Sequence, residues 1–151
     1  MNTFIKSRLA PCGLHCGKCF AFADGDIRRD AENLRRSLGD FDAYALRFVG
    51  MLNEPRFRAY PDFREFLQLL TESSCRGCRE EQCKLFRGCK VRACSEAHGV
   101  DFCFRCPEFP CRNTGFDEHL YVRHVAINER MREIGPEAYY EEVRDLPRYR
   151  K

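Results

Sequence analysis

The sequence of 151 residues has no long apolar run, and no stretch approaches the roughly 20 apolar residues that a membrane-spanning helix requires. Its first eleven residues lack the apolar segment, flanked by basic residues, that is typical of a secretory signal. Alternation of apolar and polar residues, the pattern of a half-buried strand, is weak throughout. These absences argue against a membrane partner and predict a cytoplasmic protein with few or no strands.

Disulfide bonds are not expected, although the chain contains 11 cysteines. In a reducing cytosol, clustered cysteines are typically metal ligands or catalytic groups. An odd number of cysteines also prevents complete pairing within one chain. The cysteines are therefore predicted to bind metal.

The cysteines fall in three clusters along the chain. The first reads Cys12-Gly-Leu-His-Cys16-Gly-Lys-Cys19. The second contains Cys75, Cys78, Cys83, Cys89 and Cys94, and the third contains Cys103, Cys106 and Cys111. Each cluster includes one C-x-x-C pair, whose spacing lets two thiolates bind one tetrahedral ion. All eleven cysteines are therefore candidate metal ligands, and two or three zinc ions are expected.

Three separate tetrahedral sites would require twelve ligands, one more than the cysteines supply. A histidine could complete the set, because His15 lies within the first cluster and His98 lies four residues after Cys94. A histidine beside cysteine ligands also commonly donates a hydrogen bond to one of them without binding the metal itself. Both roles stay open for these two residues.

An iron–sulfur cluster is the alternative to zinc at the first cluster. Cys12, Cys16 and Cys19 could hold three corners of a [4Fe–4S] cluster, and the remaining eight cysteines would then form two zinc sites. This C-x3-C-x2-C spacing is that of radical S-adenosylmethionine enzymes. Their partial barrel, however, needs alternating strands and helices over a longer chain. Since radical chemistry is thus disfavoured, an iron–sulfur cluster at this site would instead indicate redox sensing or electron transfer.

Enzymatic activity is less favoured than a structural role for the metal. Nucleophilic catalysis needs one low-pKa cysteine beside a base, whereas these cysteines crowd one another. A metal-dependent hydrolase needs an open position on the ion, and all-thiolate ligation makes zinc a poor Lewis acid. His119 and His124, five residues apart on a helix, lie about 140° apart and are predicted to be surface or packing residues.

The formal net charge of +3 is typical of a protein that could bind nucleic acid. Eleven thiolates holding three zinc ions would, however, bring the net charge to about −2. Basic residues also alternate with the second cluster, where they either stabilise thiolates or form a solvated face. These residues are Arg76, Arg79, Lys84, Arg87, Lys90 and Arg92. The partner therefore stays unknown, with protein and nucleic acid both possible.

Apolar residues at helical spacing predict helices on both sides of the cysteine-rich segment. Gly39-Asp40 is expected to break the first of them, and Gly135-Pro136 to end one helix and begin the next. The expected helices cover residues 24–53, 61–73, 90–98, 117–134 and 136–143. Tyr149, Arg150 and Lys151 are expected to form a frayed tail.

The predicted fold is mainly α, with helices packed around an irregular, cysteine-rich, metal-binding core. A chain of this length is most simply one domain, residues 1–151. Its expected segments are the N-terminal cysteine cluster, a helical segment, a cysteine-rich metal core and C-terminal helices. They cover residues 12–23, 24–73, 74–111 and 115–145.

Several motifs together resemble a known family. They are Cys12-Gly-Leu-His-Cys16-Gly-Lys-Cys19, Cys75-Arg-Gly-Cys78, Cys89-Lys-Val-Arg-Ala-Cys94 and Gly99-Val-Asp-Phe-Cys-Phe-Arg-Cys106-Pro-Glu-Phe-Pro-Cys111. In combination, from about Cys12 to Gly135, they are similar to the small cysteine-rich prokaryotic proteins called domain-of-unknown-function 3795. The resemblance implies a cytosolic zinc-binding protein with no established activity, and an interaction module is the expected role.

Overall fold

The computed structural model describes residues 2–149, which form seven α-helices and three short 3-10 helices. The α-helices are α1 (Thr3–Arg8), α2 (Asp26–Leu38), α3 (Asp42–Met51), α4 (Tyr60–Thr71), α5 (Val91–Ala97), α6 (Glu118–Ile134) and α7 (Pro136–Val143). The 3-10 helices are η1 (Cys16–Lys18), η2 (Pro55–Ala59) and η3 (Cys103–Arg105). Within these residues, pairing between extended segments is limited to two isolated bridges. The prediction of a mainly α fold is confirmed.

The helices lie close to where the periodicity predicts them. The segment predicted at 24–53 is divided into α2 and α3 at Gly39, whose positive φ of 50° suits glycine. The other predicted helices correspond to α4, α5, α6 and α7. Helix α1 was not predicted, because six residues are too few to establish a period. No helix within residues 2–149 has both the length and the apolarity needed to cross a membrane.

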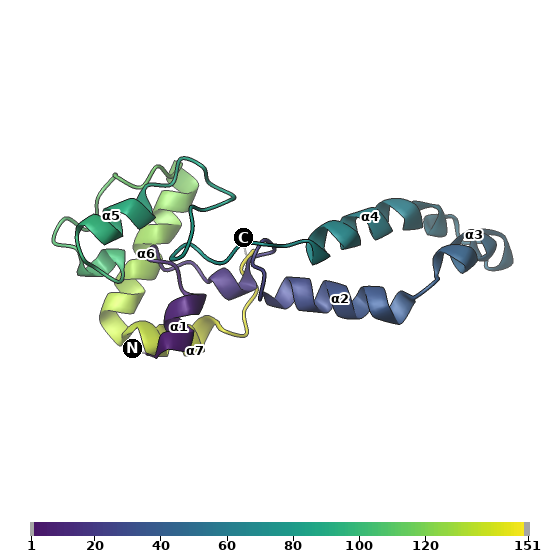
Figure 1. Cartoon of the computed structure of the whole chain (residues 1–151), viewed down its shortest axis with the longest axis horizontal. Coiled ribbons are helices and arrows are strands. Elements are labelled where there is room, and N and C mark those ends of the chain that lie inside the picture. The colour runs from purple at the N-terminus through teal and green to yellow at the C-terminus, as the bar shows by residue number, and fades with distance from the viewer. Residues whose placement is uncertain (1, 150–151) are drawn as a thin grey trace.

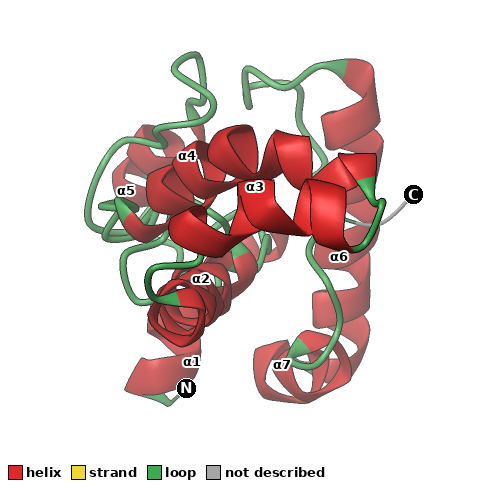
Figure 2. Cartoon of the chain, turned by 90° about the vertical axis from the view of Figure 1, so that its right-hand side faces the viewer, coloured by secondary structure: helices red, strands yellow, loops and turns green. Residues whose placement is uncertain are grey.

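The molecule has two parts, which Figure 1 shows side by side. Helices α2 and α4 pack against each other and extend away from the rest of the chain, with α3 at their far end. Figure 2, which views the molecule from that end, shows α3 in front. We call residues 26–71 the arm, and residues 2–25 with 72–149 the body. The arm buries few side chains, namely Ala31, Ala45, Leu67 and Thr71, so its own core is small.

The body contains two clusters of buried side chains. One is conventional and apolar, and consists of Ile5, Leu9, Phe102, Met131, Tyr139 and Val143. The other includes three cysteines among its members, which are Ala10, Cys12, Leu14, Cys16, Cys19, Phe22, Val91 and Leu120. Cysteine thiols thus occupy positions that aliphatic side chains fill in ordinary cores.

Helix α6 joins the two clusters through buried polar side chains. Asn128 is fully buried, and its Nδ2 donates to the carbonyl oxygen of Cys12 at 2.9 Å. Its Oδ1 accepts from the backbone N–H of Phe104 at 3.1 Å. His124 Nδ1 lies 3.2 Å from the same Cys12 oxygen, and burial lowers the pKa of this histidine. His124 is therefore a packing residue and His119 is exposed, as predicted.

Candidate metal centre

Backbone hydrogen bonds bring the three cysteine clusters together in the body. At the root of the arm, the N–H of Cys75 donates to Ala21 O at 2.9 Å, and the N–H of Ala23 donates to Cys75 O at 2.8 Å. The N–H of Cys103 donates to Pro11 O at 3.0 Å. The first cluster therefore lies between the second and the third, although these are far from it in the sequence.

Arg79, one of the cations among the cysteines of the second cluster, reinforces this convergence. Its Nε donates to the carbonyl oxygens of Lys6 and Leu9, each at 2.8 Å, and its Nη2 donates to Asp101 O at 2.9 Å. The guanidinium also lies 4.8 Å from the centre of the Phe102 ring. Arg79 therefore connects three segments of backbone and is not part of a solvated basic face.

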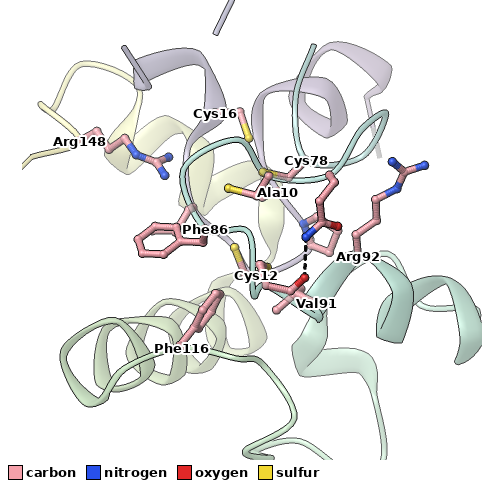
Figure 3. A pocket seen from close by; sticks show the side chains of 14 residues that line it. Ala10, Cys12, Cys16, Cys78, Phe86, Val91, Arg92, Phe116 and Arg148 are labelled. Atoms are coloured by element: carbon pink, nitrogen blue, oxygen red, sulfur yellow. Dashed lines mark hydrogen bonds between the residues drawn. The ribbon is translucent and has the colours of Figure 1, made fainter. Parts of the chain in front are cut away.

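Two small cavities adjoin the convergence point, each with a volume of about 20 Å³, enough for about one water molecule. The cysteines around the first cavity are Cys12, Cys16, Cys78, Cys83 and Cys89. Those around the second are Cys16, Cys19, Cys75, Cys78 and Cys83. Figure 3 shows the first cavity, with Cys16 beside Cys78. We call these seven residues the seven-cysteine group.

The thiol of Cys78 lies at the centre of this group. It is within hydrogen-bonding reach of both Cys16 and Cys83. These contacts lower the pKa of Cys16 to about 6 and that of Cys83 to about 5, and they raise the pKa of Cys78. Burial raises the pKa of Cys12 to about 12. Contact with Cys78 thus favours the thiolate form of Cys16 and Cys83, whereas burial favours the neutral thiol of Cys12.

Arg148 is the cation common to both cavity walls, and Figure 3 shows it among the residues that line the first cavity. Its Nη1 donates to His15 O at 2.7 Å, which fixes the guanidinium near the first cluster. Burial alone would lower its pKa, but the nearby thiols of Cys19, Cys16 and Cys12 raise it. Nothing in the local sequence around Arg148 indicates this role, because the contact depends entirely on the path of the C-terminal segment.

Tyr149 also contacts the first cluster. Its hydroxyl accepts from the N–H of Phe20 at 3.2 Å and donates to Cys19 Sγ at 3.8 Å. The prediction of a frayed tail is therefore wrong for Tyr149, because a hydroxyl and a ring that find partners near Cys19 hold the segment in place. Arg150 and Lys151 lie outside the described residues.

The remaining cysteines, Cys94, Cys103, Cys106 and Cys111, form a second group, which we call the four-cysteine group. Cys94 lies on α5, Cys103 and Cys106 flank the turn of η3, and Cys111 follows in a loop. Burial raises the pKa of Cys94, and the charges of Cys111 and Cys106 raise it further. Burial also raises the pKa of Cys103, and so do the charges of Cys12, Cys111, Cys94 and Cys106. The four-cysteine group therefore gathers around Cys103, which also lies near Cys12 of the seven-cysteine group.

His98 lies beside the four-cysteine group. Its Nδ1 is 2.9 Å from the carbonyl oxygen of Cys94 and 3.7 Å from Cys94 Sγ. Its Nε2 is 3.5 Å from a carboxylate oxygen of Glu108, and the backbone contact to Cys94 raises the pKa of this histidine. In this position His98 supports Cys94 by hydrogen bonding.

His15 is the N-cap of η1, because its Nδ1 accepts from the N–H of Lys18 at 3.1 Å. Burial lowers the pKa of His15 to about 4, so the ring is neutral near pH 7. With Nδ1 as the acceptor, the ring proton lies on Nε2, which is buried and has no hydrogen-bond partner. The ring stacks on Tyr140, with 5.3 Å between centroids. Ligation through Nε2 would require this proton to leave.

The donor atoms fit a soft or borderline metal ion. All eleven cysteines are free thiols, four of them buried and seven half-buried, and thiolates select zinc or iron–sulfur clusters over harder cations. As they stand, no three side chains of Cys, His, Asp or Glu within residues 2–149 are arranged so that they could hold an ion. Binding would therefore require thiol side chains to rotate toward a common point.

Comparison with known proteins adds a family but no activity. A family model described as a protein of unknown function (DUF3795) matches residues 8–115. This range contains all eleven cysteines and excludes Arg148 and Tyr149. Neither a curated protein nor a solved structure matches the chain.

Proposed function

We propose, for a chain that belongs to the DUF3795 family of proteins of unknown function, a zinc-binding domain whose metal centres are structural. The zinc ions would hold the body together, and the body would present the arm to a protein partner. The observation that supports this proposal is the convergence of all three cysteine clusters in the body, where three cysteines belong to one of the two buried clusters. Thiols at such positions stabilise a fold best when a metal ion joins them.

The alternative is an iron–sulfur protein that acts in redox sensing or electron transfer. Cys12, Cys16 and Cys19 are all buried, as a cluster shielded from solvent would require. However, Cys16 is in hydrogen-bonding contact with Cys78, and both line cavities together with Cys83. The open corner that the iron–sulfur alternative assumes is therefore not expected, and we keep zinc as the proposal.

Elemental analysis of anaerobically purified protein tests the identity of the metal. We expect two or three zinc ions per chain, no iron, no acid-labile sulfide and no visible absorption band, because zinc has a filled d shell. Protein expressed in medium supplemented with iron and sulfide serves as the control for loss of a labile cluster. Stoichiometric iron and sulfide in either preparation would support the iron–sulfur alternative instead.

The arm carries most of the exposed large apolar side chains. They are between 43% and 67% exposed, and they are Leu34, Tyr44, Leu46, Met51, Leu52, Phe63, Phe66 and Leu69. An exposed apolar surface of this extent marks an interaction site more often than a free surface. Charges on the arm are partly neutralised by ion pairs such as Arg64–Asp42 and Arg29–Asp26. Both features favour a protein partner over a nucleic acid.

Replacing Phe66 and Leu69 by serine is expected to abolish partner binding without unfolding the protein. Both side chains are more than half exposed, at 60% and 55%, so the free energy of unfolding should change by no more than about 0.5 kcal/mol. In-cell cross-linking followed by affinity purification measures the bound partner. Val122→Ser, at a 58% exposed position of α6 in the body, is the matched control and should keep the partner. Equal recovery with all three proteins would contradict a role for the arm.

A further inference from the structure

The seven-cysteine group divides in a particular way between its two cavities. Cys12 and Cys89 line only the first cavity, whereas Cys19 and Cys75 line only the second. The remaining three cysteines, Cys16, Cys78 and Cys83, line both. Each cavity therefore has two cysteines of its own and access to the same three shared ones.

This division matches the ligand requirement of a pair of zinc ions. Two separate tetrahedral zinc ions require eight sulfurs, but only seven are needed when one thiolate bridges both ions. Suppose that one shared cysteine is the bridge and that the other two bind one ion each. Each ion then has four sulfurs: the two cysteines of its own cavity, one shared cysteine and the bridge. The four-cysteine group then completes a third ion, and no histidine is needed.

Among the three shared cysteines, the contacts of Cys78 favour it as the bridge. The Cys78 thiol is within hydrogen-bonding reach of both Cys16 and Cys83, so it lies between them. Its sulfur therefore adjoins the thiols of both other shared cysteines, and Cys78 itself lines both cavities. The two histidines near the cysteines already have other roles, since His15 caps η1 and His98 contacts the backbone of Cys94.

Charge in the cavity walls fits the same arrangement. Seven thiolates outweigh the four positive charges of two zinc ions, so the pair would carry an excess of negative charge. A nearby cation stabilises such an excess when both are removed from water. Arg148 lines both cavities and is hydrogen-bonded to the backbone of His15. It is therefore placed to offset the charge of both ions together.

We propose that the seven-cysteine group binds two zinc ions as a thiolate-bridged pair, with Cys78 as the bridging ligand. This inference rests on the proposed zinc-binding function. Cys12 and Cys89 would complete one ion of the pair, and Cys19 and Cys75 the other. Cys16 and Cys83 would each supply one further sulfur.

Cadmium-113 substitution of the full chain tests the bridge. Native mass spectrometry should show three cadmium ions, and the cadmium NMR spectrum should show three resonances. Two of these should be split by mutual scalar coupling, because a bridging sulfur transmits coupling between the ions that it joins. The third resonance, from the four-cysteine group, should be a singlet. Cys78→Ser should remove the splitting, whereas the control Cys106→Ser should remove the singlet and keep the coupled pair.

The outcomes separate the bridge from the proposed function. Bound cadmium and zinc with no coupling between any resonances would overturn the bridge and leave zinc binding intact. Failure of the wild-type protein to bind either ion, or stoichiometric iron and sulfide in the purified protein, would overturn both. If Cys78→Ser does not fold, the wild-type splitting still decides whether a bridge exists. Cys16→Ser and Cys83→Ser should each keep the splitting, and its loss in either variant alone would assign the bridge to that cysteine instead.

Discussion

Under the proposed zinc-binding function, removal of zinc is expected to abolish the cooperative thermal unfolding transition of this protein. A structural zinc ion contributes on the order of 10 kcal/mol of folding free energy, whereas the net stability of a whole domain is only about 5–15 kcal/mol. Three of the cysteines belong to one of the two buried clusters of the body, and the arm has few buried side chains of its own. Circular dichroism at increasing temperature, under reducing conditions and with a high-affinity zinc chelator, measures the transition.

The control for this experiment is the same chelator saturated with zinc, which should leave the transition unchanged. Adding excess zinc to the stripped protein should restore both the helical signal and the cooperativity, because the thiols stay reduced. A transition that is unaltered after elemental analysis has verified the loss of metal would contradict a structural role for the ions.

Substitution of Asn128 by leucine is expected to lower the free energy of unfolding of the zinc-loaded protein by about 3 kcal/mol. The change removes the donor to Cys12 O and the acceptor of the Phe104 N–H, both in the interior of the body. Loss of one partner of a buried hydrogen bond costs about 1–3 kcal/mol. Urea denaturation of the zinc-loaded protein, with the same total zinc in each sample, measures the effect.

Asn128 also connects the first cysteine cluster to η3, which begins at Cys103. We therefore expect the leucine variant to lose zinc to a competing chelator faster than the wild-type protein does. Asn33→Leu, at an exposed position of α2, is the matched control and should change stability by no more than about 0.5 kcal/mol. Equal stability of the two variants would show that the buried network contributes little.

Sequence periodicity predicted the long helices well, because each carries a repeated apolar pattern and glycine or proline marks several of their ends. Gly39 separates α2 from α3, and Gly135 with Pro136 separates α6 from α7. The periodicity could not indicate that α2 and α4 leave the body as an arm. That arrangement depends on which apolar faces become buried, and eight large apolar side chains on the arm stay exposed.

The sequence by itself determined the donor chemistry of this protein: eleven thiols in three clusters, with helices on either side. It could not divide the thiols into sites, because C-x-x-C spacing fixes only which sulfurs lie close along the chain. The tertiary structure decided that division, by placing the first cluster beside Cys75 and Cys103 through backbone hydrogen bonds. It alone also placed Arg148 and Tyr149 against the first cluster. Contacts between residues more than a hundred positions apart arise from the packing of the whole chain and leave no local pattern in the sequence.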